Sequence, residues 1–185
     1  MTANFWQGTR VRLRGVEPAD AEHFVRWSLD SEAARYLDFV WPPISDAAQR
    51  AVVAEDSLRR SMKDDAFDWV IVNLDGKPVG TINTHTCLPR NGTFSYGIFV
   101  DREHQQHGYA SDAISLVLRW YFHELRYQKV TVGVSADNVA SLRLHEKLGF
   151  VREGTLRRMV FTNGGYCDMV WWGMTREEFD AGFPA

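Results

Sequence analysis

The sequence has few cysteines and no long apolar run, and each shortage excludes a class of protein. Its two cysteines, Cys87 and Cys167, form no Cys-x-x-Cys pair, and they are too few for the disulfide framework of a small secreted domain. No apolar stretch approaches the roughly 20 residues that a membrane-spanning helix needs. Residues 1–8 lack the basic-then-apolar pattern of a signal peptide. We therefore expect a reduced, cytoplasmic protein.

Positive charge is also scarce. The chain has 21 Lys and Arg against 24 Asp and Glu, a net charge of −3, and its basic residues form no block beyond the pairs Arg59-Arg60 and Arg157-Arg158. Binding nucleic acid or an anionic membrane requires a basic face, so neither partner is expected. His104 and His107 are three residues apart but have no obvious third ligand, so no metal is expected.

The chain does contain regular alternations of strand and helix patterns. Its 185 residues suit a single domain, residues 1–185. Period-two patterns and turn signals predict strands over residues 10–14, 67–72, 79–86, 93–100, 130–134, 150–155, 159–162 and 166–174. Helices are predicted to begin near Pro18, near Ser45 (running to about Lys63), near Gly108 and after Asn138.

The strand 93–100, the helix 108–125 and the strand 130–134 make a β-α-β unit, whose two strands should run parallel. The turn signals Asp75-Gly76 and Asn163-Gly164 indicate antiparallel hairpins. Because the sequence predicts both kinds of connection, the expected fold class is α+β with a mixed sheet.

The loop over residues 101–110 is the first candidate binding site. It follows a strand and opens a long amphipathic helix, whose first N–H groups have no intrahelical partner and carry partial positive charge. Such a helix start can receive a diphosphate, and Gly108 lets the backbone approach a ligand closely. A single glycine before a helix is also an ordinary cap, so the loop alone leaves both interpretations open.

Two motifs together resemble a known family. The segment Gln105-Gln106-His107-Gly108-Tyr109-Ala110 resembles the Q/R-x-x-G-x-G/A motif of the GNAT acetyltransferases. About 30 residues later, the segment 138–150 looks like that family's N-x-x-S/A…K-x-G-F pattern. The tail from Gly154 to Asp168 is similar to the RimJ/RimL-like branch, which contains the ribosomal-protein N-terminal acetyltransferases. The resemblance implies the GNAT fold, a central, mixed, mostly antiparallel twisted sheet of about seven strands flanked by helices.

The resemblance also implies acetyl-CoA as co-substrate. Residues Ile98, Phe99 and Val100 would offer backbone groups to the pantetheine arm, and residues Gln105, Gln106, His107, Gly108, Tyr109 and Ala110 would wrap the pyrophosphate. Asn138 would contact the cofactor near its pantetheine, and Ser141 would lie near the thiol. The activity implied is transfer of an acetyl group to a primary amine by direct attack.

The catalytic residues are less clearly indicated. Many family members have a tyrosine where this chain has His145 and use it to protonate the leaving thiolate. His145, with its ordinary pKa near 6.5, could do the same, and Ser141 is the alternative hydrogen-bond donor. Relatives often carry a glutamate on the strand before Gly97, where this chain has Ser95 and Tyr96 instead. His85 is the candidate base, since strand alternation puts it on one face with Asn83 and Cys87.

The acceptor amine is expected to be a protein N-terminus or a small molecule. Asp30, Glu32, Asp38, Trp27 and Trp41 cluster in sequence, and acidic and aromatic groups attract cations. The alternative function is a non-catalytic acyl-CoA-binding regulatory module, motivated by the missing tyrosine. Relatives in the family are often dimers, so a homodimer is a further expectation.

Overall fold

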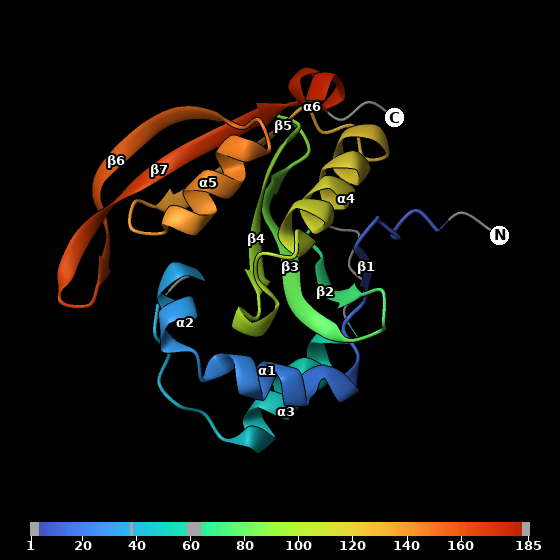
Figure 1. Cartoon of the computed structure of the whole chain (residues 1–185), viewed down its shortest axis with the longest axis vertical. Coiled ribbons are helices and arrows are strands. Elements are labelled where there is room, and N and C mark those ends of the chain that lie inside the picture. The colour runs from blue at the N-terminus through green and yellow to red at the C-terminus, as the bar shows by residue number, and fades with distance from the viewer. Residues whose placement is uncertain (1–3, 38, 59–63, 183–185) are drawn as a thin grey trace. The chain divides into compact units, whose positions relative to one another are not determined.

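The computed structural model describes residues 4–37, 39–58 and 64–182 (Figure 1). A seven-stranded sheet has the order β1-β2-β3-β4-β5-β7-β6. The chain divides into two compact units, the first made of Met1–Thr84 and Gly97–Leu116 and the second of His85–Tyr96 and Val117–Ala185. The division falls inside strands β3 (Pro78–Leu88) and β4 (Thr93–Val100) and inside helix α4 (Tyr109–His123).

The first unit begins with an antiparallel arrangement of strands. Strand β1 (Val11–Arg14) pairs with β2 (Asp68–Asn73), and β2 pairs with the start of β3. Val11 and Leu13 are buried on one side of β1 while Arg12 between them is exposed, which is the period-two pattern of a strand with one covered face. The helical elements here are a 3-10 turn (Pro18–Asp20), α1 (Ala21–Ser28), α2 (Ser31–Leu37) and α3 (Asp46–Asp56).

The second unit is built around a long hairpin. Strands β6 (Val151–Thr162) and β7 (Gly165–Thr175) form that hairpin, and β7 also pairs antiparallel with β5 (Lys129–Ser135) (Figure 1). The start of β4 pairs parallel with β5, as the β-α-β pattern predicted. The helices α5 (Val139–Lys147) and α6 (Arg176–Gly182) complete the unit.

Aromatic side chains form the core of this second unit. Phe94 of β4 stacks on Tyr121 of α4 with ring centroids 4.0 Å apart, and Tyr127 packs edge-on against both rings. All three are buried. Large aromatic residues contribute the most apolar area per residue, so this cluster fixes the last turns of α4 on the strands.

Several predicted elements are confirmed, and their capping residues explain why. Ser45 accepts a hydrogen bond from the Ala48 N–H and begins α3, and Asn138 accepts one from Ser141 and begins α5. Gly149 has a φ of +84° and ends α5, which is the expected use of glycine after a helix.

Other predictions need correction. The helix expected to run from Ser45 to about Lys63 ends at Asp56, and residues 59–63 lie outside the described residues. The separate strands expected at 150–155 and 159–162 are one strand, β6, whose register with β7 shifts between Leu156 and Val160. Helices α2 and α6 were not predicted, because each is only seven residues long and has too little periodicity to detect.

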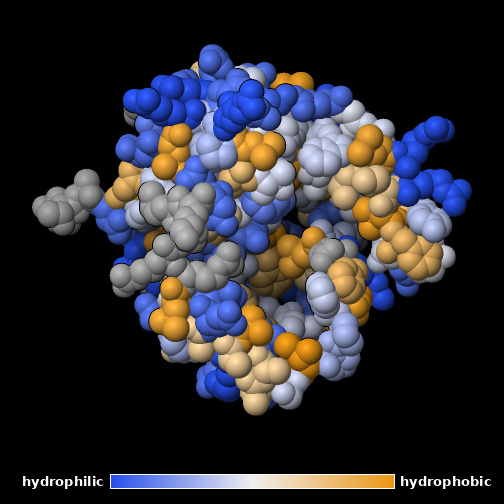
Figure 2. All heavy atoms as spheres, turned by 180° about the vertical axis from the view of Figure 1, so that it is seen from behind, coloured by the Kyte–Doolittle hydropathy of each residue, from blue (hydrophilic) through white to orange (hydrophobic). Residues whose placement is uncertain are grey.

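Some large apolar side chains remain exposed. Figure 2 shows apolar residues lying among hydrophilic ones on one face of the molecule. The exposed large apolar side chains of strands β6 and β7 are Val151, Leu156, Met159, Phe161 and Tyr166. Within the described ranges, no helix combines the length and apolarity needed to cross a bilayer.

Candidate active site

The loop between β4 and α4 has the backbone conformation of a tight turn. After a 3-10 turn over Arg102–His104, Gln106 and Gly108 both have positive φ, +64° and +79°. Helix α4 starts directly afterwards at Tyr109, and its first closing hydrogen bond runs from the Asp112 N–H to the Gly108 carbonyl. The N–H groups of the first turn therefore point out of the helix end, which is the geometry that favours an anion.

Two side chains close this loop on itself. The Gln105 amide donates to the Val100 carbonyl at 3.1 Å, and His107 Nδ1 lies 2.7 Å from the Gln105 carbonyl oxygen. An amide nitrogen carries two N–H donors, so one donor of Gln105 is occupied inside the loop. The sequence assigned this residue to phosphate oxygens, which leaves its second N–H for that purpose.

Sequence reasoning missed Arg10. A Cβ placed on Gly108 would lie 3.1 Å from both Cδ and Nε of Arg10, and the guanidinium donates to the His107 carbonyl at 3.3 Å. The arginine thus lies against the loop, where it adds a positive charge to that of the helix end. Its position in an alternating strand-like segment gave no signal of this role, because residues 10 and 108 are distant in sequence.

Asp112 holds Arg10 in place. Its carboxylate accepts hydrogen bonds from the backbone N–H groups of Thr9, Arg10 and Val11 at 3.3, 2.7 and 2.9 Å. A carboxylate in the first turn also complements the helix dipole. One side chain of α4 therefore ties the segment before β1 to the start of the helix.

The backbone of β4 is only partly available to a ligand. The Phe99 carbonyl lies against Gly80, where any Cβ would collide with it, and the Asp101 N–H donates to the Val79 carbonyl at 2.9 Å. Backbone polar groups alternate in direction along a strand, so those of Ile98 and Val100 point away from β3. The Phe99 ring packs on Trp27 with centroids 5.4 Å apart.

In the second unit, the start of α5 holds the remaining residues predicted to contact the cofactor. Asn138 caps the helix through its side-chain oxygen, 3.0 Å from the Ser141 nitrogen. Its amide N–H groups point elsewhere, since the oxygen is the group engaged at the cap. The Ser141 hydroxyl lies 3.4 Å from Nδ1 of His145.

His145 is buried, with 1% of its surface exposed. Its Nδ1 lies 2.8 Å from the Ser141 carbonyl oxygen and its Nε2 lies 2.9 Å from the Tyr96 hydroxyl. Burial lowers the pKa of His145 below its ordinary 6.5, although the Ser141 carbonyl acts in the opposite direction. The imidazole is therefore uncharged at neutral pH. Tyr96, which the sequence assigned no role, is the partner that sequence reasoning missed.

His85 has a different environment. It is exposed, and its Nδ1 lies 3.0 Å from the hydroxyl of Thr86. Neighbouring protein displaces part of its water and lowers its pKa below 6.5. Thr86 has a φ of +50°, so the strand is irregular here and the alternation expected from Asn83 through His85 to Cys87 is interrupted. The Cys87 sulfur lies 3.8 Å from the Tyr121 hydroxyl, on the side covered by α4.

Some of the residues expected to attract the acceptor amine already form ion pairs within the protein. Asp30 and Glu32 both bind Arg102, at 3.2 and 2.8 Å, which neutralises part of their charge. Trp27 is buried and Trp41 is exposed, so these two tryptophans do not share an environment. Asp38 lies outside the described residues.

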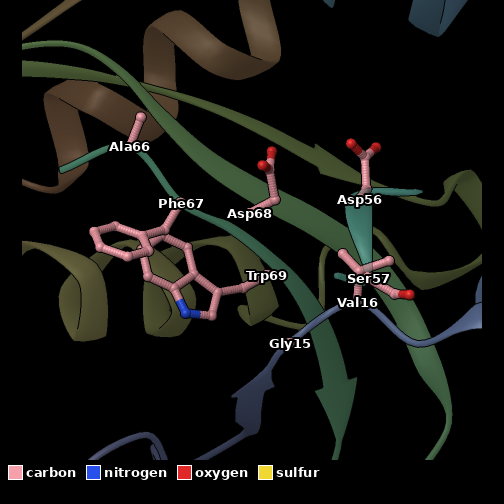
Figure 3. A pocket seen from close by; sticks show the side chains of 8 residues that line it. All are labelled: Gly15, Val16, Asp56, Ser57, Ala66, Phe67, Asp68 and Trp69. Atoms are coloured by element: carbon pink, nitrogen blue, oxygen red, sulfur yellow. The ribbon is translucent and has the colours of Figure 1, made fainter. Parts of the chain in front are cut away.

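A pocket of about 190 Å³ lies elsewhere in the first unit. Figure 3 shows the rings of Phe67 and Trp69 on one side of it and the carboxylates of Asp56 and Asp68 on the other. The lining residues are Gly15, Val16, Asp56, Ser57, Ala66, Phe67, Asp68 and Trp69. Ligand pockets for drug-sized molecules usually exceed ~300 Å³, so this pocket is too small for a nucleotide cofactor.

In the described part of the chain, the side chains that come nearest to a metal-binding set are Asp101, Glu103 and His104. One ligand atom from each lies within 4.8 Å of the others. The Asp101 carboxylate is already in an ion pair with Arg26 at 2.7 Å. This pairing leaves the set a weak candidate for a cation.

Known proteins resemble this chain over most of its length. The profile of the acetyltransferase (GNAT) domain matches residues 10–151. The chain is 41% identical over 180 residues to the SPbeta prophage-derived uncharacterized N-acetyltransferase YokL of Bacillus subtilis (strain 168), covering 97% of this chain and 98% of the relative. It is 24% identical over 156 residues to the spermidine N(1)-acetyltransferase of Escherichia coli (strain K12), covering 84% and 81%.

A solved structure has the same fold. The spermidine N-acetyltransferase from Vibrio cholerae in complex with CoA and spermine matches with a TM-score of 0.79 at 20% identity, covering 91% of this chain and 97% of that one. The predicted mixed sheet of about seven strands flanked by helices is thereby confirmed. With a domain profile that matches more than half of its length, this chain belongs to the GNAT family of acetyltransferases.

Proposed function

We propose that the protein transfers an acetyl group from acetyl-CoA to a primary amine by direct attack. The observation that carries the proposal is the loop before α4. There, outward-pointing N–H groups of the helix end, a glycine with positive φ and the guanidinium of Arg10 converge. The helix end and the guanidinium both carry positive charge, so together they favour a bound anion, and a diphosphate is such an anion.

We assign each part of the cofactor to the residues that would bind it. Residues Gln105 to Ala110 of the first unit bind the pyrophosphate, together with Arg10. The backbone of Ile98 and Val100, which points away from β3, receives the pantetheine arm. In the second unit, Asn138 contacts the cofactor near its pantetheine and Ser141 lies near the thiol end. The assignments other than Arg10 follow the family resemblance by position, and that of Arg10 rests on its contacts with Gly108 and the His107 carbonyl.

The chemistry requires a free amine, a polarised thioester and a route for protons. Backbone N–H groups that point at the carbonyl oxygen would stabilise the charge that develops there. An alkylammonium must lose a proton before it attacks, and the departing thiolate must gain one. Ser141 and His145 are our candidates at the thiolate, and His85 is our candidate base. His85 is exposed and its pKa is lowered, which suits uptake of a proton near neutral pH.

We further propose that the chain belongs to the RimJ/RimL-like branch and accepts either a peptide N-terminus or a small amine. The similarity to the Escherichia coli spermidine acetyltransferase makes polyamines the first small amines to test.

The test is an assay of thiol release from acetyl-CoA in the presence of an amine panel. The panel contains spermidine, spermine, free amino acids, an aminoglycoside and peptides with different N-terminal residues. Turnover with any of these supports the proposal. Tight binding of CoA by calorimetry without turnover on any amine would instead support a non-catalytic acyl-CoA-binding module. Loss of both binding and turnover would reject the whole assignment.

A further inference from the structure

A buried hydrogen-bonded chain joins β4 to α5. Tyr96, 3% exposed, and His145, 1% exposed, meet at 2.9 Å between the hydroxyl and Nε2. The other imidazole nitrogen contacts the Ser141 carbonyl at 2.8 Å. The pair therefore links strand β4, at the residue before Gly97, with the helix turn that begins at Ser141.

The positions of the protons follow from the partners. A carbonyl oxygen can only accept, so Nδ1 of His145 must donate to Ser141 and carry the proton. In the neutral imidazole Nε2 is then an acceptor, and the Tyr96 hydroxyl donates to it. The resting histidine has no proton on the nitrogen that faces Tyr96. It is consequently ready to take up a proton rather than to give one.

The same heavy-atom positions are also compatible with a protonated, positively charged His145. An imidazolium would donate from Nδ1 to the Ser141 carbonyl and from Nε2 to the Tyr96 oxygen, and both contacts already have hydrogen-bond length. The phenolic proton of Tyr96 would then be free to point elsewhere. The pair can gain or lose a proton without any heavy atom moving.

The surroundings isolate this exchange from other charges. Phe150 and Trp172 pack on the imidazole, with ring centroids at 5.0 and 6.4 Å, and Tyr96 lies at 6.0 Å. Among these side chains and Ser141, only Tyr96 and His145 titrate. A purely structural contact in such an apolar place is better made by an apolar side chain, because a buried polar pair gains little net stability.

We infer that Tyr96 and His145 form a proton relay for the acetyl transfer, an inference that rests on the proposed function. As the amine attacks, its N–H proton moves to the Tyr96 oxygen while the phenolic proton moves to Nε2 of His145. When the C–S bond breaks and its electron pair goes to sulfur, Tyr96 gives a proton to the thiolate and recovers one from Nε2. The proton lost by the amine is the one gained by CoA, so no other co-reactant is needed. The relay requires the Tyr96 hydroxyl to meet the reacting atoms when cofactor and amine are bound, and His145 then acts through Tyr96.

The first experiment removes only the hydroxyl of Tyr96. Tyr96→Phe should lower kcat by about 100-fold, the lower range for a lost proton-transfer group, with CoA affinity by calorimetry within about twofold. The matched control is Tyr121→Phe, which also removes the hydroxyl of a fully buried tyrosine and should leave kcat within about twofold. In the wild type, kcat should fall as the pH drops through the lowered pKa of His145. Because His85 gives an acidic limb of its own, the test compares His85→Ala with the double variant His85→Ala/His145→Phe, in which the remaining acidic limb should be missing.

A second measurement does not depend on activity. Long-range nitrogen–proton NMR correlations of the wild type at pH 7.5 should identify His145 as neutral with the proton on Nδ1. A proton on Nε2, or equal kcat in Tyr96→Phe and wild type, would overturn the relay. Turnover that persists without Tyr96 rejects the relay but leaves the acetyltransferase proposal standing. A wild type without turnover on any amine rejects both.

Discussion

The backbone conformation of Gly108 suits both the turn into α4 and the diphosphate binding that we propose for this loop. Its φ of +79° lies in the left-handed region, where a side chain is strained, and any Cβ would press on the Arg10 side chain. Glycine therefore allows the chain to turn sharply into α4 while the guanidinium stays against the loop. The same absence of a side chain leaves the helix end open to a diphosphate.

We predict that Gly108→Glu weakens CoA binding by more than about tenfold, because a carboxylate placed at the loop repels the diphosphate. The matched control is Gly76→Glu, since Gly76 has a similar φ of +85° in a hairpin turn with no neighbour within 4 Å. Both variants carry the strain of a left-handed side chain, but only one carries charge at the loop. Calorimetric titration with CoA measures the difference. An affinity of Gly108→Glu within about twofold of wild type, about 0.4 kcal/mol, would show that the loop is misassigned.

For single residues, the sequence indicated features that lie within one segment, but it did not indicate contacts between residues that are distant in the sequence. The pattern from Gln105 to Ala110 and the cap at Asn138 are local, so a single segment of sequence carries them. Arg10 beside Gly108 and Tyr96 beside His145 are contacts between residues distant in sequence, and nothing in either segment announces the other. The sequence shows that His145 stands where many relatives have a tyrosine, but it does not show that Tyr96 is the hydrogen-bond partner of His145.

Helix α4 is the element that organises the first unit around the loop. Its first turn carries Asp112, which accepts three backbone hydrogen bonds from the segment before and at the start of β1. The Thr9 hydroxyl adds a fourth at 3.2 Å. Through these contacts the helix fixes both its own N-terminus and the backbone of Arg10.

We expect Asp112→Ala to destabilise the fold by about 1–3 kcal/mol, because the Val11 N–H and its neighbours lose their acceptor. Asp46→Ala is the control, since Asp46 is also an acidic residue in the first turn of a helix and tests the helix-dipole effect alone. Urea unfolding followed by fluorescence gives both values. Equal losses for the two variants would mean that the contacts with residues 9–11 contribute nothing beyond the dipole.

Element boundaries were predictable where a capping residue or hairpin turn marked them. Ser45, Asn138 and the Asn163-Gly164 turn, in which both residues have positive φ, are examples. The shift in β6 was not predictable, because it depends on Asp168 of the partner strand accepting a hydrogen bond from the Arg158 N–H at 2.8 Å. A bulge set by a neighbouring strand has only a weak signal in its own sequence.

At the scale of the whole molecule, the charge state of a few groups sets how stability varies with pH. Burial lowers the pKa of His145, and displaced water lowers that of His85, both from 6.5. The pKa of Asp30 is lowered from 3.8, chiefly by the hydrogen bond from the Ala33 N–H and also by Arg102. The two histidines therefore determine how stability changes around pH 6, and the Asp30 carboxylate affects stability only in more acidic solution.

We predict that the free energy of unfolding is constant above about pH 7 and falls as the pH drops below 6.5. In that range the unfolded chain binds protons that the folded chain does not, so acid favours unfolding. His145→Phe should flatten the fall between pH 6.5 and 5, because it removes a group whose pKa is lowered on folding. Chemical denaturation at half-unit pH intervals tests this. A free energy that rises toward pH 5 would contradict the lowered pKa values.

Among the strands that the structure describes, β6 lies at one end of the order, so one of its backbone edges pairs with none of them. It is 12 residues long and largely exposed, the kind of edge on which a second polypeptide can add itself. The left-handed Arg158, with a φ of +54°, and the adjacent Arg157 interrupt this edge near its middle. The uninterrupted strand edge that an approaching copy would meet is therefore shorter than the 12 residues of β6.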